Sequence, residues 1–440
     1  MKLVSPSRED GIARVASEVA GGPAGTHVGA GRHGFWTAGA VLAVGVTVFM
    51  AVALLLRQHC RRTLWVSPDQ FTHACYSDIP ALVASGAERQ PVGVRGLFWL
   101  LAALAPGGRA EPRQAFDIAV VVLAVAAVLL VWAVLRLAGP RPWDAALVAF
   151  SPVLLTASLV SLDLVAVALA VLGLLAFSRR RPWLAGALVG LAIATRPLAV
   201  LVLLALVLVA LRAGRWGHVR RTLLAAAVAW SAVNVPVLLA SRDTWTAYWS
   251  GLWRPTVGYG SVWLLPQLGG HAVSGTTARW LFVLGALVVV ALVALFTLST
   301  SYRPRIPVVV LLLVVGILVM SPVVPVQASL WVLPFAALAV PRWRDLLIWA
   351  GAEVLYDTVT WFYVYGLTEA NRAAPAWFYG TVLVVRMLAM AWLAYRAVSI
   401  GREPWHDPVR SPSSARGLGR DDPAAGDLED APDALVIRFV

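Results

Sequence analysis

Residues 120–135 read VVVLAVAAVLLVWAVL, and residues 200–211 read VLVLLALVLVAL. Neither stretch holds a charged side chain or the polar–apolar alternation of a membrane barrel strand. Uninterrupted apolar runs of this kind are typical of segments that cross a hydrocarbon core roughly 30 Å thick. Within that core only a helix satisfies every backbone hydrogen bond inside one segment. The sequence therefore predicts an all-α, polytopic transmembrane helical bundle.

The overall composition agrees with these runs. Hydrophobic residues occupy 60% of the 440 positions and charged residues 13%, with a mean hydropathy of +0.77. A soluble domain is about half apolar and a quarter charged, so a series of soluble domains is excluded. The net charge of +13 does not indicate nucleic-acid binding, because the arginines lie in short links between apolar runs, where they orient spans.

The apolar runs predict about twelve spans in a transmembrane domain at 34–399. The flanking tails at 1–33 and 400–440 are polar enough to be disordered. The piece at 93–106 is shorter, so we expect an amphipathic helix lying in the membrane interface. The expected spans are 36–56, 116–136, 144–160, 161–178, 183–196, 197–211, 222–240, 279–299, 307–321, 328–341, 346–365 and 375–399.

The basic links set the expected orientation. Counting spans places the arginine-rich links, such as 179–181 and 220–221, on one face of the membrane. The positive-inside rule assigns that face to the cytoplasm. Both termini are then cytoplasmic, and loops 57–115 and 241–278 lie on the outer face of a bacterial plasma membrane. Long loops on one face of a scaffold commonly carry function.

The first outer loop holds two aspartates, Asp69 and Asp78, with His73 and Tyr76 between them. A carboxylate beside aromatic residues can act as a general base, although any loop must be polar somewhere. Cys60 and Cys75 lie in the same loop. They are either a disulfide, which an oxidising exterior would favour, or two separate thiols.

The second outer loop repeats tryptophan every four residues, at Trp245, Trp249 and Trp253. On a helix these indoles share one face, which suits either stacking on sugar rings or an aromatic belt at the interface. Arg254 follows directly. Its guanidinium can bind a phosphate through two parallel hydrogen bonds, or it is an ordinary exposed charge.

Asp163 and Arg196 lie at the outer ends of expected spans, where ionisable residues are costly and commonly functional. With Asp78 they form a candidate cluster of acids and a cation on one face. The sequence contains no Walker, dinucleotide-binding, HExxH or Cys/His metal motif. We therefore expect neither a metal nor a cofactor.

Several stretches resemble a known family. PDQFTHACYSDIPAL (68–82), SLDLVAVALA (161–170), RPWLAGALVGLAIATRP (181–197) and the long second-loop stretch at 234–265 are collinear with it, as is the segment at 327–363. They are similar to actinobacterial polytopic glycosyltransferases of family 87, which have the type C fold and use polyprenyl-phosphate mannose.

The resemblance implies an inverting transfer of a sugar, mannose first, from a polyprenyl-phosphate donor to a lipid-linked or cell-wall glycan. It places the general base on Asp78, with Asp69 as the rival, and makes Arg196 and Arg254 the candidates for binding the donor phosphate. Residues expected to bind sugar or acceptor are His73, Tyr76, Asp163, Trp245, Trp249, Trp253 and Gln327. The expected partners are membrane lipid, donor lipid and glycan acceptor, with no nucleic acid.

Three positions depart from the family pattern. Gln90 stands where relatives carry the acid of an EYP motif, and Arg196 stands where they carry a lysine. An NKxxSPQY element is reduced here to Gln327. These departures leave open a catalytically inactive relative that binds polyprenyl-phosphate lipid or scaffolds envelope assembly. A lipid or glycan transporter is a further alternative, disfavoured because no internal repeat is found.

Overall fold

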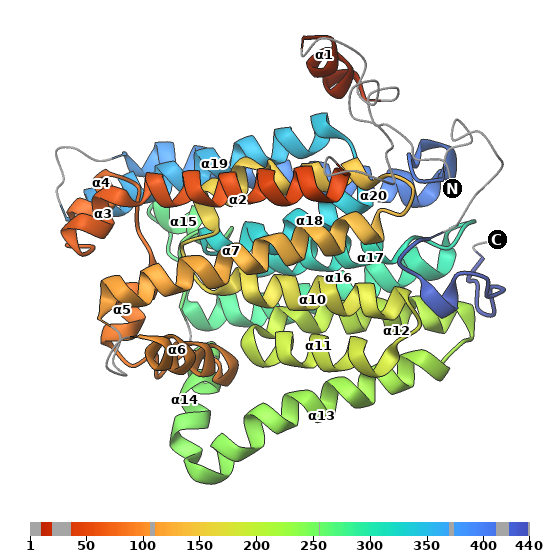
Figure 1. Cartoon of the computed structure of the whole chain (residues 1–440), viewed down its shortest axis with the longest axis horizontal. Helices are drawn as coiled ribbons and strands as arrows, with labels where there is room; N and C mark the ends of the chain where they lie inside the picture. The colour runs from red at the N-terminus through yellow and green to blue at the C-terminus, as the bar shows by residue number, and fades with distance from the viewer. Residues whose placement is uncertain are drawn as a thin grey trace.

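The computed structural model describes residues 10–19, 37–105, 111–254, 256–368, 374–410 and 422–438. Every regular element within these ranges is a helix (Figure 1), which confirms the all-α prediction. The α-helices are α1 (Gly11–Val19), α2 (Ala38–Leu56), α3 (Gln58–Thr63), α4 (Asp69–Thr72), α5 (Asp78–Ala84), α6 (Val92–Leu104), α7 (Pro112–Leu137), α8 (Ala146–Ala149), α9 (Pro152–Ala157), α10 (Asp163–Ser178), α11 (Pro182–Thr195), α12 (Val200–Ala213), α13 (Gly217–Ala240), α14 (Arg242–Leu252), α15 (Leu264–Leu268), α16 (Gly275–Ser299), α17 (Ile306–Met320), α18 (Ser329–Ala339), α19 (Trp343–Gly366) and α20 (Ala376–Arg402). Short 3-10 helices are η3 (Pro142–Ala145), η4 (Pro197–Ala199), η5 (Val326–Ala328), η7 (Pro404–His406) and η8 (Gly426–Leu428).

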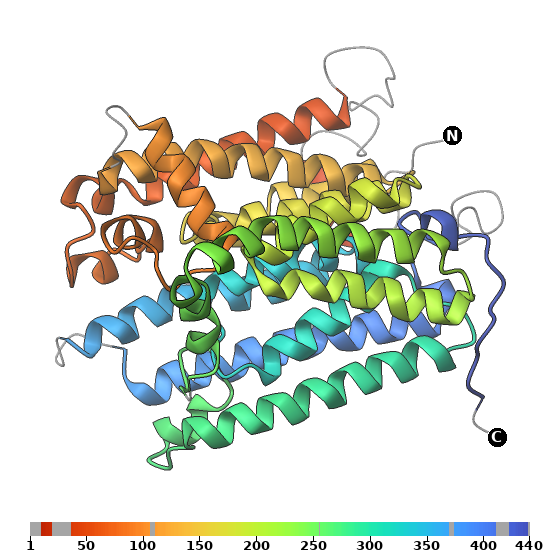
Figure 2. The same cartoon turned by 90° about the horizontal axis from the view of Figure 1, so that it is seen from below.

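The long helices lie side by side along the longest axis of the molecule (Figures 1 and 2). Helix α10 packs on α7 and α11, α11 packs on α13, and α19 packs on α20. Gly186 and Gly190 of α11 lie so near α13 that an added Cβ would meet the α13 backbone. Small residues that let helix backbones approach in this way are common at helix interfaces in membranes.

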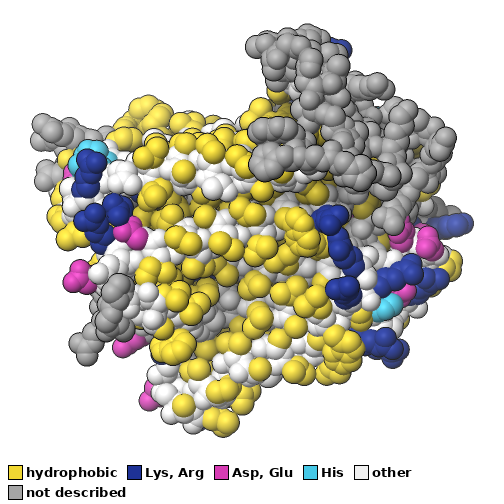
Figure 3. Space-filling view, in the orientation of Figure 1, with side chains coloured by type: hydrophobic (Ala, Val, Ile, Leu, Met, Phe, Trp, Pro, Cys, Tyr) yellow, Lys and Arg dark blue, Asp and Glu magenta, His cyan; other side chains and the backbone are white. Residues whose placement is uncertain are grey.

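Among the described residues, five helices are long and apolar enough to cross a membrane: α2, α7, α13, α16 and α20. Hydrophobic side chains cover the middle of the face seen in Figure 3, whereas charged side chains gather towards its two ends. An apolar surface of this extent suits lipid rather than water. The chain is therefore a membrane protein.

The predicted number of twelve spans is not confirmed. Helices α10, α11 and α17 have 16, 14 and 15 residues. At 1.5 Å per residue they reach about 21–24 Å, against a hydrocarbon core of about 30 Å. The span expected at 144–160 is divided among η3, α8 and α9. The division falls where Ser151 caps α9 and Pro152 occupies its first position.

Shorter elements collect at the ends of the bundle. Helices α3, α4, α5, α6 and α14, which belong to loops 57–115 and 241–278, lie at one end, and residues 422–438 lie at the other (Figure 1). Helix α6 stands where the amphipathic helix was expected. It buries Val94, Phe98 and Leu101, three or four residues apart, while Trp99 is exposed.

The described parts of the tails are packed, which differs from the disorder expected at 1–33 and 400–440. Asp433 pairs with Arg212 at 2.6 Å, and Asp407 pairs with Arg305 at 2.6 Å. The acidic C-terminal residues therefore neutralise basic helix ends. In the N-terminal tail, residues 11–19 form α1; residues 1–9, 20–33, 411–421 and 439–440 lie outside the described ranges.

Candidate active site

Asp78 is the first residue of α5, and its position is fixed by a turn far along the chain. Its backbone N–H donates to the carbonyl oxygen of Val160 at 2.7 Å. The neighbouring Ser77 hydroxyl donates to the carbonyl oxygen of Leu159 at 2.8 Å. The same hydroxyl accepts from the first turn of α5 and so caps the helix. The start of α5 is thereby tied to the segment that precedes α10.

The Asp78 carboxylate accepts two side-chain hydrogen bonds. The Tyr76 hydroxyl donates to Oδ1 at 2.7 Å, and the Gln327 amide donates to Oδ2 at 3.3 Å. Desolvation raises the pKa of the Asp78 carboxyl above the ordinary aspartate value, and the hydrogen bond from Tyr76 offsets this only in part. A carboxylate with a raised pKa is a stronger proton acceptor, as a general base requires.

A second acid, Asp163, opens α10 and pairs with Arg196 from the turn between α11 and η4. Arg196 donates to Asp163 Oδ1 through Nε at 2.7 Å and lies 2.6 Å away through Nη2. The hydroxyl of Ser161 and the indole of Trp331 also donate to the Asp163 carboxylate, at 2.8 and 3.4 Å. Arg196 extends its remaining nitrogen, Nη1, to the amide oxygen of Gln90 at 3.1 Å.

The two acids belong to one electrostatic cluster. The charge of Arg196 lowers the pKa of Asp78, and the charge of Asp163 raises it. Tyr248 of α14 also interacts electrostatically with this cluster. Burial raises the pKa of its hydroxyl to about 12, although the charge of Arg196 lowers it in part. The structure therefore brings together Asp78, Tyr76, Gln327, Asp163 and Arg196, all of which were singled out from the sequence.

Three contributors were missed. Gln90 was noted only as a departure from the family pattern, yet it binds Arg196. Trp331 and Tyr248 lie in stretches that resemble the family, but nothing in their spacing points to Asp163 or Arg196. Tyr248 falls between two of the tryptophans that drew attention first, and it is the member of that helix which lies near the cluster.

The tryptophans singled out in the second loop have different surroundings. Trp245 and Trp249 have ring centroids 5.8 Å apart, and the Trp245 indole donates to the Asn234 side chain at 3.2 Å. Trp253 follows the last residue of α14 and is 58% exposed. Arg254 is also exposed, and no contact joins it to the cluster within the described residues.

An apolar groove of about 910 Å³ opens beside the cluster. It lies between α5, α6, α10, α11 and α13, and its lining includes Leu82, Phe98, Leu169 and Val237. Thr195, which also lines it, directly precedes Arg196. Its residues are overwhelmingly apolar, so the groove suits a hydrocarbon chain that reaches the charged cluster from the side.

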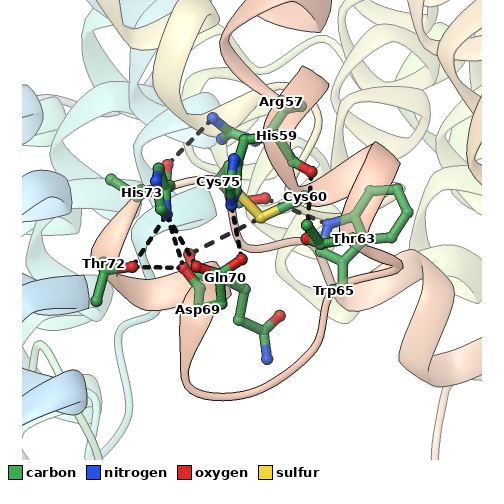
Figure 4. The surroundings of a disulfide bond; sticks show 11 residues. Arg57, His59, Cys60, Thr63, Trp65, Asp69, Gln70, Thr72, His73 and Cys75 are labelled. Carbon is green, nitrogen blue, oxygen red and sulfur yellow. Dashed lines mark hydrogen bonds and ion pairs between the residues drawn. A yellow bond between two sulfur atoms is a disulfide. The ribbon is translucent and has the colours of Figure 1, made fainter.

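Asp69 and His73 lie elsewhere in the first loop, beside a disulfide between Cys60 and Cys75 (Figure 4). The bond decides between the two alternatives that the sequence left open for these cysteines. Asp69 and His73 make no direct contact with Asp78 in the part of the chain that the structure describes. The arrangement therefore places the two aspartates of the first loop, Asp69 and Asp78, in different sites.

Comparison with known proteins places the chain in a family. The sequence model of glycosyltransferase family 87 matches residues 97–325, more than half of the chain. The match includes Asp163, Arg196 and α14, whereas Asp78 and Gln90 precede it. A search of curated proteins finds no match. Its apolar helices, its charged cluster and this match together show that the chain belongs to glycosyltransferase family 87.

Proposed function

We propose that this membrane glycosyltransferase transfers mannose from a polyprenyl-phosphate donor to a lipid-linked or cell-envelope glycan, with inversion at the anomeric carbon. The observation that carries the proposal is the pairing of Asp163 with Arg196 beside an apolar groove whose lining includes Thr195, the residue before Arg196. The groove would hold the polyprenyl chain of the donor. Its phosphate would then lie near the guanidinium of Arg196.

The chemical step assigns a role to each charged group. The Asp78 carboxylate accepts the proton of the acceptor hydroxyl while that oxygen forms a bond to the anomeric carbon. The bond between this carbon and the phosphate oxygen breaks, and its electron pair leaves with the phosphate. Arg196 stabilises the charge that develops there. Asp163 holds Arg196 in place through two contacts from one carboxylate oxygen.

Gln90 and Arg196, which both depart from the family pattern, act together in this scheme. Gln90 supplies a neutral oxygen to Arg196 at 3.1 Å, and Asp163 supplies the negative charge. An arginine offers more donors than a lysine in a fixed planar arrangement. It can therefore keep both contacts and still present an N–H to a phosphate.

We propose further that the end of the bundle bearing α5, α6 and α14 faces outward, and that both termini are cytoplasmic. The Cys60–Cys75 disulfide supports this orientation, because such bonds persist in oxidising surroundings. Arg212, Arg303 and Arg305 lie at the opposite end with the C-terminal segment. In this proposal the shorter helices complete a type C fold of about twelve crossings.

The test is transfer of radiolabelled mannose from polyprenyl-phosphate mannose by membranes that contain the chain. Asp78→Asn keeps the shape of the side chain and removes the base, so transfer should fall by about 100-fold or more. Asp243→Asn, an exposed acid in the first turn of α14, is the matched control and should transfer normally. Equal amounts of each protein must be present.

Two results would overturn the proposal. Normal transfer by Asp78→Asn with loss in Asp69→Asn would move the base to Asp69. Absence of transfer with every lipid sugar and envelope acceptor, while the wild-type chain still binds donor lipid, would identify an inactive relative.

A further inference from the structure

A group of three side chains of the types that ligate metal ions lies in the first loop, away from the Asp78 cluster. His59 belongs to α3, Asp69 begins α4, and His73 follows the last residue of α4. The Cys60–Cys75 disulfide joins the two segments one residue after His59 and two residues after His73 (Figure 4). The covalent bond therefore brings together side chains that are 14 positions apart.

The ligand atoms of the three side chains converge. Asp69 Oδ2 lies 2.6 Å from His59 Nε2, and Asp69 Oδ1 lies 3.2 Å from His73 Nδ1. The two imidazole rings stack with centroids 3.5 Å apart and an angle of 14° between their planes. One atom from each residue falls within 4.8 Å of the other two. All three side chains are 37–45% exposed, so a cation can reach them from solvent.

We propose that His59, Asp69 and His73 bind a Zn²⁺ ion. Two imidazoles and one carboxylate are ligands that Zn²⁺ prefers, whereas Ca²⁺ and Mg²⁺ take oxygen ligands. With metal–ligand bonds of about 2.0–2.1 Å, the edge of a tetrahedral site is about 3.3 Å. The distance between Asp69 and His73 already fits. The His59–Asp69 contact must open by about 0.7 Å. The two stacked rings must also turn apart so that both nitrogen lone pairs face the ion, and the exposed histidine side chains leave room for this movement.

Water would complete the coordination at the exposed side of the site. The Thr72 hydroxyl lies 3.0 Å from His73 Nδ1, so it must release this nitrogen when the metal binds. The cysteines are not available as ligands because they are bonded to each other. The site therefore depends on the disulfide for geometry and on the three side chains for coordination.

The metal would act as a positioning element for the neighbouring site. Phe71, which lies between Asp69 and His73 in sequence, stacks on Tyr76 with ring centroids 5.7 Å apart. Tyr76 in turn donates to the Asp78 carboxylate. An ion that fixes α4 to α3 would restrict the loop that carries Phe71 and Tyr76. The metal itself touches no group of the Asp78 cluster.

The test titrates Zn²⁺ into the purified full-length chain, prepared in detergent without a polyhistidine tag and stripped with a chelator. Calorimetry should detect one Zn²⁺ per chain. Loss of a residue that only hydrogen-bonds to a metal ligand weakens metal binding by about 10–100-fold. His73→Ala removes a ligand itself, so it should weaken Zn²⁺ binding by more than about 100-fold. His271→Ala is the matched control, since His271 is an exposed histidine of the other long loop, and it should bind Zn²⁺ as the wild type does.

Two further measurements make the outcome decisive. X-ray absorption of the Zn²⁺-loaded chain should show nitrogen and oxygen scatterers with two imidazoles, and Zn²⁺ should slow hydrogen exchange across residues 69–76. Zn²⁺ binding that survives in both His73→Ala and Asp69→Asn would refute the site. So would sulfur scattering, displacement by equimolar Ca²⁺, or the absence of a bound ion in the wild type.

Discussion

The ion pair between Asp163 and Arg196 can be tested by removing its cation. Arg196→Met keeps an extended side chain of similar length and takes the charge away. The pair is largely shielded from water, because the Arg196 side chain is 21% exposed and that of Asp163 is 9% exposed. After the change, the Asp163 carboxylate keeps only the neutral hydrogen bonds from Ser161 and Trp331.

The expected loss of stability follows from these contacts. Removing one partner of a buried ion pair costs about 3–5 kcal/mol, because the remaining charge is left without compensation. The two remaining hydrogen bonds of Asp163 and the partial exposure of Arg196 place the expected cost at the lower end of this range. We expect the free energy of unfolding to fall by about 3 kcal/mol, which is about 150-fold in the folding equilibrium constant.

The assay is equilibrium unfolding in mixed micelles of dodecyl maltoside and SDS, followed by tryptophan fluorescence. A double-mutant cycle adds Asp163→Asn and the double variant. Because Asp163→Asn removes the unpaired charge, the double variant should lose less than the sum of the single changes, by at least about 1.5 kcal/mol. Arg254→Met, an exposed arginine of the same outer region, is the control and should change stability by less than about 0.5 kcal/mol.

Either of two results would refute the reasoning about this pair. One is an Arg196→Met protein as stable as Arg254→Met. The other is strict additivity in the cycle, because it would mean that Asp163 and Arg196 do not stabilise each other.

Three other predictions concern separate features. Gly260 has a φ of +77° and packs so closely that a Cβ would meet the Val324 carbonyl oxygen, so Gly260→Ala should cost about 3 kcal/mol or more in micellar unfolding. Gly270 has a φ of +85° with open space around it, so Gly270→Ala should cost only about 1–2 kcal/mol; equal losses would contradict the packing argument. Because desolvation raises the pKa of Asp78, the folded chain holds this proton more tightly than the unfolded chain does. The free energy of unfolding therefore falls as pH rises from about 3.9, the unfolded value, through the folded pKa, and Asp78→Asn should abolish that part of the pH dependence. Transfer should rise over the same pH interval, since only the carboxylate accepts a proton. A stability difference between wild type and Asp78→Asn that stays constant with pH would contradict the predicted pH dependence of stability. Replacing both Cys60 and Cys75 by serine should lower the free energy of unfolding by about 3 kcal/mol, because the bond closes a loop with a sequence separation of 15; the double variant should then be insensitive to reductant, and sensitivity would point to another cause.

Sequence reasoning reached the helical class and several site residues for identifiable reasons. An apolar run such as 120–135 is a local property of the chain, and the backbone must form a helix wherever such a run meets lipid. Asp163 and Arg196 were noticed because charges at the ends of apolar runs are costly. The structure shows that these two side chains compensate each other.

Other expectations are not confirmed, for physical reasons. The count of twelve spans rests on apolar composition, which does not reveal where Ser151 and Pro152 interrupt a run. The acidic C-terminal tail looked disordered by composition, because its partners Arg212 and Arg305 are distant in sequence. His59 was not considered, since only the Cys60–Cys75 bond brings it to His73.

The sequence by itself determined that this chain is a helical membrane protein, because hydrophobicity and helix formation act on neighbouring residues. It also marked the acids and the arginine of the candidate site. Only the tertiary structure decided their partners: Gln327 meets Asp78 across 249 positions, and Gln90 meets Arg196 across 106. Such contacts depend on how whole helices pack, and no local pattern of residues encodes that distance.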